Sequence, residues 1–72
     1  MVRAKFKVDE KVINAFNEKI TLSPVMWNSP ENEEFFKTTP SGRIEIWIKN
    51  PEASNQFHPG KEFYVDFTEV PS

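Results

Sequence analysis

Alternating apolar and polar positions predict a strand near each end of the chain. Toward the C-terminus, residues 62–68 place Phe63, Val65 and Phe67 on one face and polar or aromatic residues on the other. Pro59-Gly60 directly precedes them and predicts a type II turn, because proline supplies the φ of the first central position and glycine accepts the positive φ of the second. Residues 62–68 are therefore the best-patterned strand in the sequence.

The first eight residues show the same alternation, with a basic outer row. Their apolar positions are Val2, Ala4, Phe6 and Val8, and the cations between them are Arg3, Lys5 and Lys7. The alternation breaks at residues 9–11, which leaves two continuations open: one long bent strand reaching about Ala15, or a short second strand. The facing of Phe16 is open in either case.

A hairpin tip is predicted at Asn17-Glu18, followed by a strand over about 19–26. Pro24 has no backbone N–H to donate, so we expect this strand to lie at a sheet edge or to bulge at the proline. A bulge reverses the facing of the residues after it, which brings Val25 or Trp27 inward.

The middle of the chain predicts a short helix. Ser29 suits the N-cap, Pro30 suits the first helical position, and we expect Phe35 or Phe36 to pin the helix to the sheet. Residues 38–42 then end the helix and turn the chain.

A further strand is predicted over residues 43–49, with its three isoleucines facing inward. Its outward residues are Arg43, Glu45, Trp47 and Lys49. Asn50-Pro51 repeats the capping pattern and predicts a single helical turn, after which Phe57 returns to the core.

This order of elements predicts a mainly β protein. Strands joined by short connections favour antiparallel neighbours, so we expect a small twisted antiparallel sheet or partly closed barrel of four to five strands, with one short helix over an opening. If the first segment splits in two, the order becomes three strands, a helix and two strands, which is the order of an OB-like barrel. With 72 residues, the chain is expected to form one domain spanning residues 1–72.

A chain of this length buries only about 60% of the surface that its unfolded form exposes, so its core must be built from large side chains. Seven Phe, two Trp and one Tyr supply them. The sequence has no cysteine and a single histidine, which excludes a disulfide framework and an ordinary zinc site. Self-association is the remaining way to add stability.

The net charge of −2 supplies no long-range attraction for nucleic acid or an anionic membrane. The sequence has neither an apolar run of membrane-spanning length nor the apolar segment of a signal peptide. We therefore expect no membrane partner and no secretion, and a cytosolic location in a cell of any kind.

The outward residues of the strands include a candidate interaction face of cations and aromatics. Its members are Arg3, Lys5, Lys7, Arg43, Trp47, Lys49 and Tyr64. If the first, third and last strands lie side by side, these residues form one surface that suits single-stranded nucleic acid, because cations follow phosphates and rings stack on bases. Glu45, Glu62 and Asp66 project from the same rows, and the same residue types are enriched at protein interfaces.

No catalytic or metal-binding pattern emerges from the sequence. His58 precedes a proline in a turn and is expected to be exposed, while Glu31, Glu33 and Glu34 fit the start of a helix by favouring its dipole. Ser29 and Ser41, considered as nucleophiles, have no histidine near them in sequence. The sequence has two glycines, which are too few for a glycine-rich phosphate-binding loop. The sequence therefore predicts no enzyme, no cofactor and no metal.

Several segments resemble a group of small uncharacterised proteins of tailed bacteriophages and related marine sequences. The resemblance rests on residues 3–6, 22–25, 29–32, 36–37, 39–42 and, most specifically, 57–68. It implies a phage or phage-derived origin, a mostly β protein, and a location in the cytoplasm of a bacterial host cell or in association with a virion. It assigns no functional residue.

We therefore expect a non-enzymatic protein-interaction or structural accessory module, acting on a protein partner or on itself as a homodimer. The alternative is a single-stranded nucleic-acid-binding small β-barrel that uses Trp47, Tyr64 and the N-terminal cations.

Overall fold

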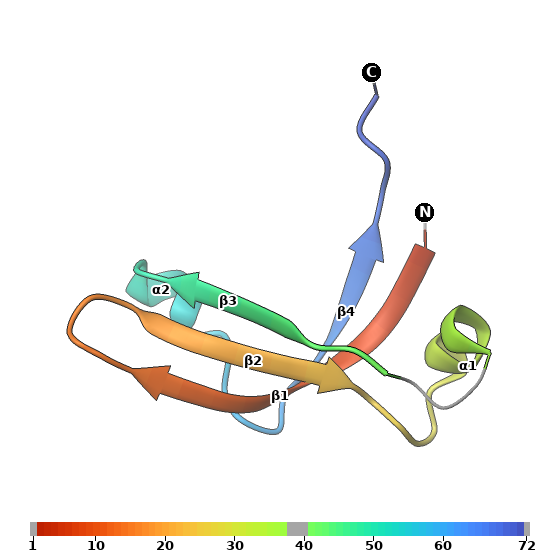
Figure 1. Cartoon of the computed structure of the whole chain (residues 1–72), viewed down its shortest axis with the longest axis horizontal. Coiled ribbons are helices and arrows are strands. Elements are labelled where there is room, and N and C mark those ends of the chain that lie inside the picture. The colour runs from red at the N-terminus through yellow and green to blue at the C-terminus, as the bar shows by residue number, and fades with distance from the viewer. Residues whose placement is uncertain (1, 38–40, 72) are drawn as a thin grey trace.

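Four strands and two short helices make up the computed structural model, which describes residues 2–37 and 41–71 (Figure 1). In chain order the elements are β1 (Val2–Ile13), β2 (Glu18–Pro24), α1 (Pro30–Phe36), β3 (Ile44–Ile48), α2 (Pro51–Ser54) and β4 (Glu62–Phe67). The strands form one sheet in the order β3-β2-β1-β4, and every neighbouring pair is antiparallel. The sheet curls into a half-barrel, which confirms the mainly β antiparallel fold.

β1 is a single long strand that bends. Its residues 2–7 pair with β4, and its residues 6–13 pair with β2, with a shift of register between Val8 and Glu10. The shift lets β1 follow two directions, so the two arms of the sheet stand at an angle to each other (Figure 1). The long bent strand is therefore the correct alternative, and the split that an OB-like order needs does not occur.

Two predictions about β2 were wrong: the position of the turn before it, and its place at a sheet edge or a bulge at Pro24. The turn before it spans residues 14–17 rather than Asn17-Glu18, because the Asn14 side chain accepts hydrogen bonds from the backbone N–H groups of Phe16 and Asn17 (2.9 and 2.8 Å). β2 is an inner strand, not an edge, and ends at Pro24, although the Val25 N–H that follows still donates to the Lys5 carbonyl of β1 (3.0 Å). The register shift lies in β1 instead of at this proline.

The side chains that were hard to place are exposed. Phe16 projects from the hairpin tip and Trp27 from the connection between β2 and α1, where each is about four-fifths exposed (82% and 78%). Val25 is half-buried, so of the two candidates it is the one that turns toward the interior.

Among the residues whose burial the structure describes, the buried apolar core is small and comes from the two inner strands alone. Its side chains are Ala4, Phe6, Val8, Ile20 and Leu22. Partly buried residues from the edge strands, α1 and the loop before β4 pack against them; these are Phe36, Ile44, Ile46, Ile48, Phe57, Phe63 and Val65. Their partial burial shows that the concave side of the sheet is covered by a single incomplete layer.

The two predicted helix caps and the predicted turn before β4 are confirmed. Ser29 caps α1 by accepting a hydrogen bond from the Asn32 N–H (3.3 Å), and Asn50 caps α2 in the same way through the Glu52 N–H (3.0 Å). Gly60 has a φ of 92°, and the Lys61 N–H donates to the His58 carbonyl (3.0 Å), which closes the turn before β4. Part of the predicted turn after α1, residues 38–40, lies outside the described residues.

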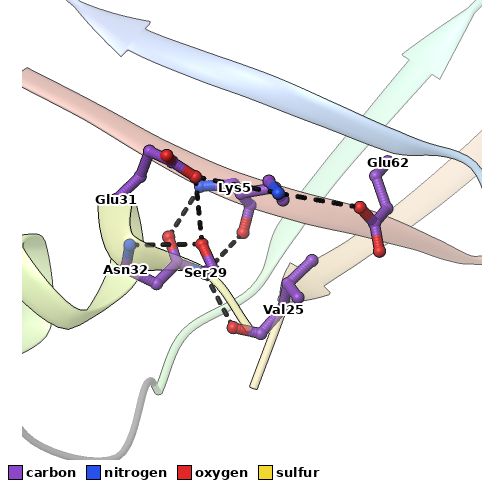
Figure 2. Close-up of polar contacts among 6 residues, drawn as sticks. All are labelled: Lys5, Val25, Ser29, Glu31, Asn32 and Glu62. Atoms are coloured by element: carbon purple, nitrogen blue, oxygen red, sulfur yellow. Dashed lines mark hydrogen bonds and ion pairs between the residues drawn. The ribbon is translucent and has the colours of Figure 1, made fainter. Parts of the chain in front are cut away.

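Asn32 joins α1 to the sheet where β2 has ended. Its carboxamide oxygen accepts from the Lys5 N–H (2.6 Å), and its amide nitrogen donates to the carbonyls of Lys5 (2.7 Å) and Val25 (2.8 Å) (Figure 2). The side chain thus takes the place that a further peptide group of β2 would occupy beside β1. Asn32 is only 1% exposed, so water cannot readily take over its hydrogen bonds to these backbone groups.

Replacing Asn32 with alanine should lower the free energy of unfolding by about 2 to 3 kcal/mol, since the Lys5 N–H and the Val25 carbonyl lose the partner that Asn32 supplies, while the Lys5 carbonyl keeps the Val25 N–H. Urea unfolding of the variant measures the loss. Glu33→Ala, an exposed neighbour on the same helix, is the matched control and should stay within about 0.5 kcal/mol of the unsubstituted chain. Equal losses in the two variants would contradict a structural role for the Asn32 carboxamide.

Candidate interaction surfaces

The seven residues of the candidate interaction face do not form one surface. β2 lies between β3 and β1, so the condition that the first, third and last strands be neighbours fails. Arg3, Lys5 and Tyr64 lie together where β1 meets β4. Lys7 follows them along β1 and lines a hollow of about 300 Å³ with Trp27 and Glu62. The remaining three, Arg43, Trp47 and Lys49, belong to the opposite edge.

On the β1–β4 side, the cations are held by carboxylates and by a ring. Arg3 makes a two-pronged contact with Asp66 (Nε–Oδ1 2.6 Å, Nη2–Oδ2 3.1 Å), and its guanidinium lies 4.7 Å from the centre of the Tyr64 ring. The Lys5 ammonium lies 3.7 Å from Glu31 and 3.9 Å from Glu62 (Figure 2). The anions that the sequence placed in these rows therefore neutralise the cations.

The β3 side shows the same pairing. Glu45 lies 3.2 Å from the Lys19 ammonium and 3.6 Å from the Arg43 guanidinium, and Lys19 lies 5.9 Å from the centre of the Trp47 ring. Among the described residues, Lys7 and Lys49 have no carboxylate within 4 Å. The convex face of the sheet is thus a mosaic of paired charges rather than a positive track for phosphates.

The concave face has the opposite character. An open groove of about 380 Å³ lies between β3 and β4 and is mainly apolar, with Tyr64 and Asp66 of β4 also on its lining. Its apolar lining comes from Leu22, Ile44, Ile46, Phe57, Phe63 and Val65. Phe57 and Phe63 pack ring to ring at its floor, with centroids 4.8 Å apart. We call these six residues and the space between them the concave groove.

The register explains why the groove is apolar along both arms. Ile44 and Ile46 lie opposite Leu22 and Ile20, and Phe63 lies opposite Phe6, so all share the inward face of the sheet. Trp47 lies opposite Lys19 on the other face. The inward facing predicted for the three isoleucines is correct, but these side chains remain only partly covered.

Polar side chains inside the fold have structural roles. Lys11 reaches across to α2, where its ammonium donates to the Ser54 carbonyl (3.0 Å) and lies 3.7 Å from Glu18, and the Ser54 hydroxyl donates to Glu18. Within residues 2–37 and 41–71, no three His, Asp or Glu side chains gather closely enough to hold a metal ion. No helix in the same residues has the length and apolarity needed to cross a membrane.

Comparisons with protein-family models, curated proteins and solved structures gave no significant match. The assignment of a function therefore depends on the geometry of this chain, and the resemblance to phage proteins stays a prediction.

The concave groove was missed in the sequence because period-two alternation tells which residues face inward but not whether anything covers them. The sequence did carry one sign of the groove: the predicted strands have many inward apolar residues, and few residues are left in the helices to cover them. Four strands present apolar rows, while the two helices have only seven and four residues with which to cover them.

Arg3 controls the acidity of Asp66. The hydrogen bond from the guanidinium, with its positive charge, holds the pKa of the Asp66 carboxyl below its ordinary value of 3.8 and raises that of Arg3. Because the folded-state pKa of Asp66 is lowered, this pair stabilises the fold above the ordinary carboxyl pKa, and the contribution is lost as the pH falls through the lowered value.

We expect Arg3→Gln to raise the pKa of Asp66 back toward 3.8. Carbon-13 NMR of the Asp66 carboxyl over an acid titration measures the midpoint in both proteins. Lys61→Gln, a change in the turn before β4, is the control and should leave the midpoint where it is. An Asp66 midpoint that is the same with and without Arg3 would show that the ion pair does not form in solution.

Proposed function

We propose that this protein is a non-enzymatic interaction module that binds a protein partner through its concave groove. The observation that carries the proposal is the open apolar inner face of the half-barrel, lined by both edge strands. The groove residues are buried or half-buried, and the apolar hollow between them can receive the side chains of another molecule.

The shape of the chain supports this function. Its Cα radius of gyration is 13.5 Å, whereas a folded domain of this length has about 11 Å. It measures 40 × 35 × 16 Å, so it is one sheet thick in its shortest direction. A chain that forms one bent layer cannot enclose its own inner face, and a partner supplies the missing layer.

The edges of the groove add a second binding element. Within the described part of the chain, β3 pairs only with β2, and β4 pairs only with β1, so each leaves one row of backbone N–H and C=O groups without a strand beside it. An incoming strand can use these groups for hydrogen bonds while its side chains enter the groove. Protein recognition by strand addition therefore fits both the edges and the apolar lining.

Ile46→Glu should abolish binding through the groove, because it buries a carboxylate at an apolar contact. Trp47→Glu is the matched control, since it makes the same change on the adjacent residue of β3 but on the convex face. The test immobilises each full-length variant at low density and offers two analytes separately, a cell lysate and the purified chain. Far-UV circular dichroism confirms that each variant is folded.

We expect at least one analyte to bind the unsubstituted chain and Trp47→Glu, and to bind Ile46→Glu at least about tenfold more weakly, the loss typical of a central interface residue. Binding that is equal for Ile46→Glu and the unsubstituted chain, or no binding of either analyte, would overturn the proposed function.

Single-stranded nucleic acid should not bind, because the cations of the convex face are divided between two edges and largely paired with carboxylates. Titration of tryptophan fluorescence with a short oligonucleotide at low and at physiological salt measures this directly. Saturable quenching that weakens with salt and disappears in Trp47→Glu would support the nucleic-acid-binding alternative. It would contradict the inference that the paired charges of the convex face leave no site for phosphates.

A further inference from the structure

The chain exposes more surface than a folded monomer of its size. Its accessible area is 5494 Å², whereas a compact monomer of 8.4 kDa exposes about 4600 Å². Part of this excess of about 900 Å² comes from side chains outside the groove, such as Phe16, Trp27 and Val70. The remainder leaves room for a partner, and a stable protein–protein interface buries roughly 800 Å² on each side.

The direction of the strands points to a second copy of the chain as this partner. Each neighbouring pair is antiparallel, and four is an even number, so the two edge strands β3 and β4 run in opposite directions. When two copies face each other about a twofold axis parallel to the strands, β3 of each copy lies beside β4 of the other and antiparallel to it. Both free edges of both copies are then paired.

We propose that two copies of this chain close an eight-stranded antiparallel barrel, four strands from each, with the concave grooves facing each other inside it. The proposal rests on the proposed function, since it names the partner of the same groove. An eight-stranded barrel has an interior that side chains can just fill, and here the apolar rows of both copies fill it. Closure also removes the exposed edges, which are a hazard for a soluble sheet.

The period of two limits the register at the new junction. Inward residues must lie opposite inward residues, so the isoleucines of β3 face the row of Phe63, Val65 and Phe67 in the other copy. Placing Ile46 opposite Phe63 also sets Glu45 opposite Tyr64 and Arg43 opposite Asp66. A shift of two residues sets Glu45 opposite Asp66, and like charges directly opposite each other are unfavourable. The first register is the one we infer.

The charges at the two edges agree with this pairing. In the inferred register, Arg43, the residue before β3, has a mostly exposed side chain (66%) and lies opposite Asp66 near the end of β4, where it joins the Arg3–Asp66 ion pair of the other copy. Lys49 then follows the other end of β3, near Glu62 at the start of β4. Each end of the junction therefore joins a cation to a carboxylate, and the twofold axis repeats both contacts.

Sedimentation equilibrium of the purified chain tests the dimer. Twice the mass of 8.4 kDa is expected for the unsubstituted chain and for Trp47→Glu, and monomer for Ile46→Glu under the same conditions. Since Ile46→Glu also removes apolar contacts within one copy, a second measurement keeps every core side chain in place.

This second measurement uses the absence of cysteine from the sequence. Glu45→Cys and Tyr64→Cys, each on the convex face, are prepared as separate proteins, mixed and oxidised. The inferred register brings the two thiols together only across the junction, so a disulfide should form between the two different variants. Glu45→Cys alone should give no disulfide-linked dimer, because the two copies of β3 lie on opposite sides of the barrel.

A folded chain that stays monomeric up to about 1 mM, the weak limit of specific binding, would overturn the dimer. Groove-dependent binding of a lysate protein in that case would leave the proposed function intact. A dimer that is insensitive to Ile46→Glu, or that cross-links Glu45→Cys only to itself, would overturn the barrel. Loss of both self-association and lysate binding would overturn the proposed function as well.

Discussion

The structure depends on the backbone pairing of β1, the one strand that contacts both arms of the sheet. Its first half pairs with β4 and its second half with β2, and the shift between Val8 and Glu10 allows the bend between them. Where β2 ends, the Asn32 carboxamide continues the hydrogen bonding of β1. Because only two residues of β1, Phe6 and Lys7, have strands on both sides, the sheet curls strongly, and its inner face stays open between β3 and β4.

Local chemistry made much of the fold predictable. Alternation located β3 and β4, and Ser29, Asn50 and Pro59-Gly60 marked the caps and the last turn through interactions within a few residues. The errors concern long-range pairing. Pro24 indicated an edge strand, yet β2 is an inner strand that ends at the proline. The candidate face required β3 beside β1, and no local pattern encodes strand order. Asn32 resembled an ordinary helix residue because its three partners lie in β1 and after β2.

The two faces of the sheet differ in what they can bind. On the convex face, carboxylates on neighbouring strands form ion pairs with the cations, as in Arg3 with Asp66 and Lys19 with Glu45. Few cations are therefore available to bind phosphate. On the concave face, partly buried isoleucines and phenylalanines line an open groove. The hydrophobic effect acts on this face. The chain has no cysteine and only five buried apolar side chains among the described residues, so association through the concave face would add stability.

Amide hydrogen exchange, followed by NMR at low and at high protein concentration, tests most directly whether the open half-barrel is completed by association. We expect the amides of β3 and β4 that point away from the sheet to exchange rapidly in dilute solution and to become protected as the concentration rises. Amides of β1 and β2, which already have strands beside them, should change little. Exchange rates in β3 and β4 that are independent of concentration, in a chain that is folded throughout, would contradict association of the two edges.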